Sequence, residues 1–168
     1  MSAGADPALT ALHGLQRRSY AAASEGLRAA WPERQALRVA GLTGLLGRHR
    51  YCVLATARPD GRAHAAPVAF AFVEGAFWIA TVEGLRLRNL RASPWASLVV
   101  MEGEADEGEA GAPHRALTAE GSVALHGVDV VWPRLEAVWL ARHGHAPDWA
   151  TAFAELRPSR VFSHDASR

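Results

Sequence analysis

The sequence predicts a mainly β domain in which antiparallel strands form a barrel with helices beside it. Short apolar runs separated by turn residues occupy residues 51–101. The turn Arg58-Pro59-Asp60-Gly61-Arg62 and the two-residue link Glu74-Gly75 have the residue types that join hairpin strands. Ala- and Leu-rich segments with helical spacing flank these runs on the N-terminal side, and another helical segment follows them.

The predicted strands follow the apolar runs in chain order. They are Tyr51–Ala57, His64–Val73, Phe77–Val82, Trp95–Met101, His114–His126 and Arg160–Ser163. The fifth run is expected to be one strand or a pair of strands, bent at Gly121, because a glycine inside a strand marks a bulge or bend.

Helices are predicted wherever apolar residues recur at helical intervals. They are Pro7 to about Ala30, Pro32–Gly47, Gly84–Arg91, Val131–His143 and a short last helix Asp148–Leu156. A chain of 168 residues is large enough for one core, so we expect residues 1–168 to form one domain with an N-terminal helical segment at about residues 7–48.

Composition narrows the classes of function. The net charge is +1 and apolar residues make up 49% of the chain, which excludes a disordered protein and a strongly nucleic-acid-seeking surface. The chain contains no lysine, which excludes Schiff-base chemistry through a lysine side chain and so the usual linkage to pyridoxal phosphate. The only cysteine, Cys52, lies in a predicted strand, where an inert buried thiol is expected rather than a nucleophile. With no signal-peptide core and no apolar run of membrane-spanning length, we expect a cytoplasmic protein without membrane partners.

No metal site is predicted. The acidic segment Glu102–Gly111 is interpreted as a solvated hairpin loop; calcium binding is the alternative, but the carboxylates lack the spacing of an EF-hand. His126, His143 and His145 do not combine with Cys or Glu in a zinc-ligand pattern.

Four stretches, in this order, resemble the pyridoxamine 5′-phosphate oxidase-like family of FMN-binding split β-barrels. They are ATARPDGRAHAAPVAF (Ala55–Phe70), FWIAT (Phe77–Thr81), GLRLRNLRASP (Gly84–Pro94) and ASLVV (Ala96–Val100). The resemblance implies a split barrel of about six antiparallel strands. It also implies a homodimer with the cofactor at the interface.

The segment around Thr81 is the predicted phosphate site. Thr81 ends a strand, Gly84 precedes a helix, and Arg86 lies in its first turn, where free N–H groups and a guanidinium favour an anion. By resemblance, Thr81 and Arg86 bind the phosphate, Arg88 is a further candidate, and Asn89 lies near it. The alternative is that these arginines form an ordinary exposed helix face.

By resemblance, the segment from His64 to Val68 lines the isoalloxazine edge of the flavin. Its small side chains let a flat ring approach the backbone, and Pro67 lacks the donor that a sheet ladder would use. The predicted cofactor contacts of this part of the site are His64, Ala66, Pro67, Val68 and Ala80. His64 is expected either to hydrogen-bond the cofactor or to be a half-buried strand residue.

By resemblance, His114 and Arg115 reach the cofactor of the opposite subunit. The alternative is that they form the solvated start of a strand. No side chain is assigned as a catalytic acid or base.

The expected function is that of an FMN-dependent oxidoreductase acting on a small molecule of unknown identity. The alternative cofactor is the deazaflavin F420, whose longer anionic tail would use Arg50, Arg58 or Arg62. A third hypothesis is a non-catalytic flavin- or heme-binding module. Oxidation of vitamin B6 is not expected, because Ala65 and Phe70 stand where the true oxidases of the family carry basic residues.

Overall fold

The structure of the protein is a computed structural model that describes residues 6–102 and 114–166. Six strands of the described part form a closed antiparallel barrel with the neighbour order β1-β2-β3-β6-β5-β4. The strands are β1 (Tyr51–Ala57), β2 (Ala63–Val73), β3 (Ala76–Thr81), β4 (Trp95–Glu102), β5 (Arg115–Gly127) and β6 (Ala152–Asp165). The predicted barrel with flanking helices is confirmed.

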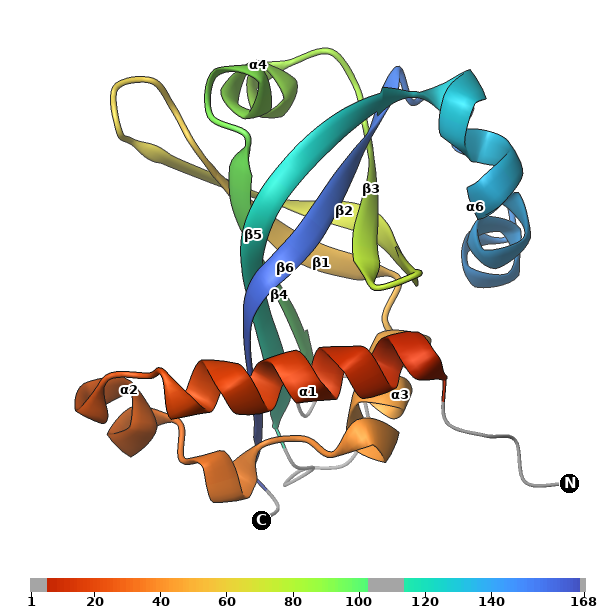
Figure 1. Cartoon of the computed structure of the whole chain (residues 1–168). Helices are drawn as coiled ribbons and strands as arrows, with labels where there is room; N and C mark the ends of the chain where they lie inside the picture. Colours follow the sequence, from red (N-terminus) through yellow and green to blue (C-terminus); the bar gives the residue numbers. More distant parts are fainter. Residues whose placement is uncertain (1–5, 103–113, 167–168) are drawn as a thin grey trace, which may run out of the picture.

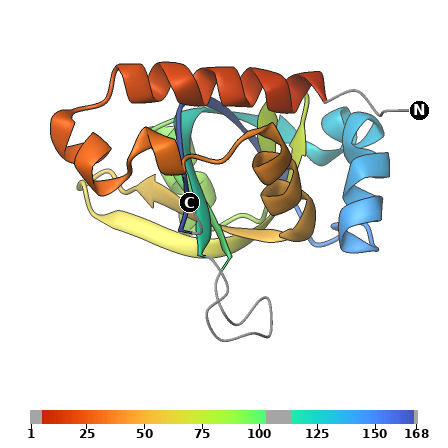
Figure 2. The same cartoon turned by 90° about the horizontal axis from the view of Figure 1, so that it is seen from below.

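Helices close both ends of the barrel and cover one side (Figure 1). Helices α1 (Pro7–Ala21) and α3 (Val39–Arg48) lie across the lower end, which Figure 2 shows from below. Helix α4 (Leu85–Ala92) lies at the opposite end, and α6 (Val128–His143) packs against the side. Leucines of α1 and α3 join the apolar interior of the barrel in one core. Among the described residues, no helix has the length and apolar character needed to cross a bilayer.

The two predicted hairpin turns are confirmed. Gly61 has φ 83°, and its N–H donates to the Arg58 carbonyl at 2.9 Å. Glu74 and Gly75 have φ values of 51° and 81°, as the mirror-image two-residue turn between twisted strands requires. The predicted bend in β5 is also present, as a register shift between Glu120 and Gly121 in its pairing with β6.

The predicted last helix, Asp148–Leu156, is wrong. Residues from Ala152 onward belong to β6, where Thr81 of β3 pairs with Ala152 on one side and Gly127 of β5 pairs with it on the other. A strand that closes a barrel makes ladder hydrogen bonds on both edges, and this pairing overrides weak local helical spacing. The predicted strand Arg160–Ser163 is the later part of the same long strand.

The N-terminal helices are shorter than predicted. The first breaks after α1, and Ser24 then caps α2 (Glu25–Ala30) by accepting from the Leu27 N–H. The predicted helix Pro32–Gly47 begins only at Val39, after a 3-10 turn, η1 (Glu33–Gln35). Leu37 stays extended because its N–H donates to Ser163 Oγ at 2.8 Å and its carbonyl accepts from Gln16 at 2.9 Å. Except for Glu102, the predicted acidic loop lies outside the described residues.

Candidate functional site

The junction of β3 and α4 holds a guanidinium without a negative partner. Arg86, in the first turn of α4, donates from Nη1 to Thr81 Oγ1 at 3.2 Å. Its Nε is buried and has no hydrogen-bond partner among the described residues, and it makes no ion pair there. Burial lowers the pKa of Arg86, which indicates a desolvated cation. Leaving such a group unpaired is unfavourable, so an oxyanion at this position would be stabilising.

A cavity of about 260 Å³ opens beside Arg86. It lies between β2 and β3 on one side and the C-terminal end of α6 with the following loop on the other. The lining residues are Tyr51, Pro67, Val68, Ala69, Ala80, Val82, Arg86, Trp139, His143, His145 and Trp149. The cavity therefore combines flat or small apolar walls with one cation, the usual character of a small-molecule site.

The structure brings together most of the residues predicted for phosphate and ring binding. Pro67, Val68, Ala80 and Arg86 line the cavity, and Thr81 is held against Arg86. Ala66 pairs with the buried Leu54 and does not line the cavity.

Three other predicted residues lie away from the cavity. His64 is half-buried at the turn end of β2, with its Nδ1 unpartnered among the described residues. Arg88 is exposed on α4. Asn89 is buried and donates from Nδ2 to Thr56 Oγ1 at 3.0 Å, which ties α4 to β1. Within one chain, the candidate anion site therefore consists of Thr81 and Arg86 rather than of the whole segment 81–89, and we call this pair the cradle.

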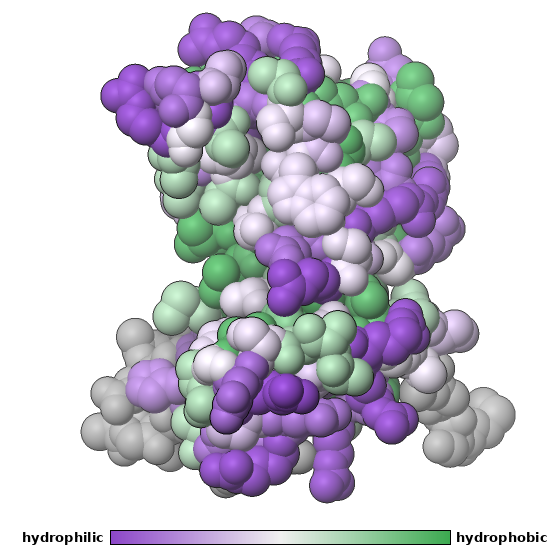
Figure 3. Space-filling model, turned by 60° about the vertical axis from the view of Figure 1, so that its left-hand side comes forward, coloured by the Kyte–Doolittle hydropathy of each residue, from purple (hydrophilic) through white to green (hydrophobic). Residues whose placement is uncertain are grey.

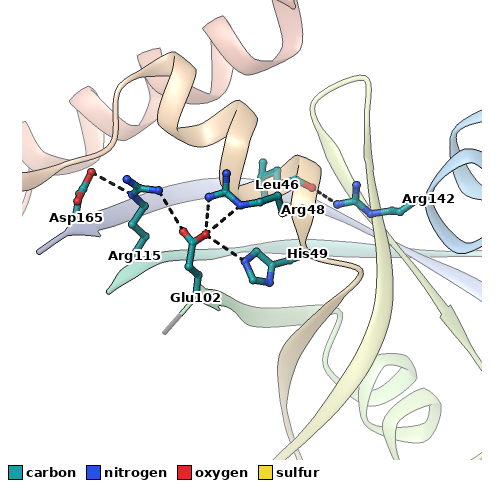
Figure 4. Close-up of polar contacts among 7 residues, drawn as sticks. All are labelled: Leu46, Arg48, His49, Glu102, Arg115, Arg142 and Asp165. Carbon is teal, nitrogen blue, oxygen red and sulfur yellow. Dashed lines mark hydrogen bonds and ion pairs between the residues drawn. The ribbon is translucent and has the colours of Figure 1, made fainter. Parts of the chain in front are cut away.

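Arg115 belongs to an ion-pair network at the lower end of the barrel (Figure 4). It contacts Glu102 at 3.6 Å and Asp165 at 3.4 Å. The Glu102 side chain is only 1% exposed and also accepts from Arg48 Nε at 3.0 Å. His49 lies 4.0 Å from the same carboxylate. This network joins α3, β4, β5 and β6.

His114 and Arg115 do not meet the cradle within one chain. Thr81 pairs with Ala152 at the start of β6, whereas Arg115 pairs with Asp165 at its end, so the two lie at opposite ends of this strand. The His114 carbonyl accepts from the Ala166 N–H at 3.0 Å. The role predicted for this pair concerns the cofactor of a second subunit and stays a prediction.

From the sequence, residues 131–156 are expected to form part of the substrate pocket, but no individual residue of the α6 wall of the cavity was predicted as a site residue. His143 Nε2 contacts the Phe70 carbonyl at 3.1 Å and therefore donates to it. The ring of Trp139 lies 4.3 Å from the His143 ring, centroid to centroid. Residues four positions apart share a helix face, so the spacing of Trp139 and His143 was a usable signal. His145 and Trp149 lie beyond the helix, where periodicity gives no information.

We expect protonation of His143 to destabilise the fold. Burial lowers the pKa of His143 from 6.5. The hydrogen bond to the Phe70 carbonyl raises this pKa, whereas Arg142, His145 and Arg50 lower it further. The unfolded chain then binds the proton more readily, so the free energy of unfolding falls as pH drops below about 6.5.

His143→Gln retains an amide donor for Phe70 but does not titrate. In urea denaturation between pH 7.5 and 5, the wild-type free energy of unfolding should fall more steeply than that of the variant, by up to about 1.4 kcal/mol per pH unit. If the free energy of unfolding of the wild type and of the variant falls equally with pH, His143 does not contribute to the pH dependence of stability.

Cys52 is buried and free, and burial raises its pKa to about 12. The predicted buried position of this thiol is confirmed, and the raised pKa favours the protonated, unreactive form at neutral pH. Among the described residues, no three His, Cys, Asp or Glu side chains lie close enough together to hold a metal ion.

Comparison with known proteins decides the family. The family model described as pyridoxamine 5′-phosphate oxidase matches residues 42–165, which include the whole barrel. The chain belongs to the pyridoxamine 5′-phosphate oxidase family. No curated protein sequence matches it.

Solved structures share the fold of this family member. A conserved hypothetical protein from Mycobacterium tuberculosis matches with TM-score 0.68 and 20% identity over 81% of this chain and 89% of that chain. A FAD-binding protein from Mesorhizobium loti matches with TM-score 0.63 and 20% identity over 80% and 97% of the two chains. An F420 reductase matches with TM-score 0.55 and 23% identity over 71% and 94%. At these identities the likeness concerns the fold.

Proposed function

We propose that the protein is an FMN-dependent oxidoreductase that acts on a small-molecule substrate. The observation that carries the proposal is the Arg86 guanidinium beside Thr81 and the start of α4, whose Nε is buried with no partner among the described residues and which makes no ion pair there. A phosphate is the group that this arrangement accommodates, since helix α4 has no side-chain cap and its first N–H groups are free to donate.

The residues around the cavity fit a flavin. Arg86, Thr81 and the α4 amides would hold the phosphate. Pro67 and Val68 would lie along the ring, where Pro67 supplies a flat wall without a competing N–H. Bound FMN would supply hydride transfer. The protein's own contribution is to orient the substrate and exclude water, for which the aromatic walls Tyr51, Trp139 and Trp149 are suited.

The absorbance spectrum of the purified protein tests this proposal. We expect flavin bands, or their appearance with saturable binding on addition of FMN, and mass spectrometry of the released group should identify FMN. A colourless protein that does not bind added FMN would contradict the proposal. A heme spectrum in place of flavin bands would favour the heme-binding alternative.

F420 is the second candidate cofactor. Arg50 is exposed, directly precedes Tyr51 of the cavity wall, and its charge reaches His143. A longer anionic tail would be stabilised by such a cation. Titrations with FMN and F420 at the same ionic strength compare the two cofactors under identical solution conditions. Tighter binding of F420, together with turnover with reduced F420, would replace FMN in the proposal.

We also propose that two chains associate through the outer face of β1, β2 and β4. Strand pairing places Tyr51 beside Ala69, and Val53 between Pro67 and Val99, on this face. Tyr51 is 63% exposed and Val53 40% exposed. Figure 3 shows one side of the molecule, where hydrophilic side chains gather at the two ends and the wall between them is mixed, with pale and hydrophobic side chains beside hydrophilic ones.

A contiguous exposed apolar face of this kind is typical of an interface. Tyr51 and Pro67 also line the cavity, so the proposed interface would border the cofactor.

Val53→Asp places a charge in the middle of this face and should produce a monomer. Sedimentation or light scattering should give twice the chain mass for the wild type and the chain mass for the variant. Val130→Asp is the control, because Val130 is 77% exposed on α6, away from this face. A monomeric wild type, or a dimer that survives Val53→Asp, would contradict the proposal.

A further inference from the structure

A second, larger cavity lies in the helical layer below the barrel. Its volume is about 590 Å³, and it is an open cavity bordered by α1, η1 and the start of α3. The lining residues are His13, Gln16, Arg17, Tyr20, Glu33, Arg34, Ala36, Leu37, Arg38, Val39 and Ala40. All of them precede residue 42, where the match to the family model begins, and none lines the cavity beside Arg86. The cavity is therefore distinct from the site described above.

The rim of this cavity carries an excess of positive charge. Arg17 comes from α1, Arg34 from η1, and Arg38 is the N-cap residue of α3. In the part of the chain that the structure describes, these three exposed arginines make no hydrogen bond or ion pair through their side chains. Other arginines, such as Arg91 with Glu83, have a carboxylate partner.

Glu33 is the one acidic residue in the lining, and His13 adds a further nitrogen donor. A single carboxylate balances only one of the three guanidinium charges. The site as a whole therefore stays cationic, with an unused excess of hydrogen-bond donors.

The inner wall of the cavity is held rigidly by buried hydrogen bonds. Tyr20 donates its hydroxyl proton to the Ser163 carbonyl at 2.7 Å, and Ser163 Oγ donates to Gln16 Oε1 at 2.6 Å. The same Ser163 Oγ accepts from the Leu37 N–H. These bonds fix α1 and the Leu37 segment to β6, so the backbone that bears the arginines is ordered before any ligand arrives. Such preorganisation reduces the entropy lost on binding.

We propose that this cavity is a binding site for a small organic anion with two or more negative charges on phosphate or carboxylate groups. Guanidinium forks match both groups in a bidentate way. The volume suits a metabolite-sized ligand, and Ala36, Leu37 and Val39 supply an apolar wall for its carbon skeleton.

Titration calorimetry with pyrophosphate and with citrate, at constant ionic strength, tests the proposal. The test variant is the double substitution Arg34→Gln and Arg38→Gln, and Arg28→Gln is the matched control, since Arg28 is exposed on α2 and does not line the cavity. We expect saturable binding of at least one probe, a loss of about tenfold or more in affinity for each arginine removed, and little change for the control. Glucose, which is neutral, should not bind.

The same titrations are run on the Arg86→Ala variant, because a phosphate probe also fits the cradle beside Thr81. Binding that persists in Arg86→Ala and is lost in the Arg34/Arg38 double variant supports the proposal, whether or not the protein binds FMN. Absence of saturable binding overturns it, as does an equal loss in Arg28→Gln. Binding that disappears only in Arg86→Ala also overturns it and assigns the anion to the other site.

Discussion

Arg86→Ala should weaken FMN binding by at least about tenfold, and by about a hundredfold if the phosphate takes two hydrogen bonds from the guanidinium. The Arg86 Nε is buried without a partner, so the side chain already bears the desolvation cost that a bound anion would offset. Its Nη1 is held by Thr81, which keeps the guanidinium oriented before binding. Flavin fluorescence titration of the apoprotein measures the dissociation constant.

Arg88→Ala is the control for this experiment. Arg88 lies two residues further along the same helix, carries the same charge and is exposed outside the cavity. Removing Arg88 changes the long-range electrostatic potential almost as much as removing Arg86 does, but it breaks no direct contact with the phosphate. The affinity for FMN should therefore change by less than about threefold in physiological salt. Equal losses in the two variants would show that Arg86 acts only through its charge. Unchanged affinity in Arg86→Ala would remove it from the cofactor site.

Gly121→Ala should destabilise the fold by about 3 kcal/mol or more. A Cβ at residue 121 would lie 2.0 Å from the Arg157 carbonyl oxygen and 2.9 Å from Pro158 Cα. Both are backbone atoms of β6, so no side-chain rotation relieves the clash. The register shift between Glu120 and Gly121 brings the strands this close. Because β5 and β6 pair along almost their whole length, relaxation would have to move the wall of the barrel.

Urea denaturation followed by circular dichroism measures this loss, with thermal unfolding as the readout if the variant is too unstable for a native baseline. Gly47→Ala serves as the control, because a Cβ there meets nothing within 4 Å and the residue lies in helix α3. That substitution should be neutral or stabilise by about 0.5–1 kcal/mol, since alanine favours helix. A small effect at Gly121 would mean that the strands separate there at little cost.

Local signals in the sequence predicted the elements that depend on local chemistry. The turn at Gly61 and the link Glu74-Gly75 have backbone angles that few residues other than glycine and its turn partners adopt, so their positions could be predicted. Pro94 follows the end of α4, and Gly121 coincides with the irregularity of β5. The order of these elements was also enough to indicate the family and the Thr81–Arg86 cradle.

Contacts between distant segments determined the features that the sequence did not reveal. Residues 148–156 have a local spacing compatible with helix, but pairing of Ala152–Leu156 with both β3 and β5 makes them a strand. Leu37 is extended because its partners are Gln16 and Ser163, and no periodicity records a partner more than a hundred residues away.

The two cavities likewise combine features that could be predicted from the sequence with features that arise only on folding. The residue types that an anion requires were visible at Thr81 and Arg86, but the choice of Arg86 over Arg88 depends on which side chain of α4 reaches the cavity. The α6 wall, with His143 and Trp149, and the convergence of Arg17, Arg34 and Arg38 exist only after folding. Turn and cap geometry is encoded within a few neighbouring residues, whereas a cavity is made by side chains from elements that meet only in the packed chain.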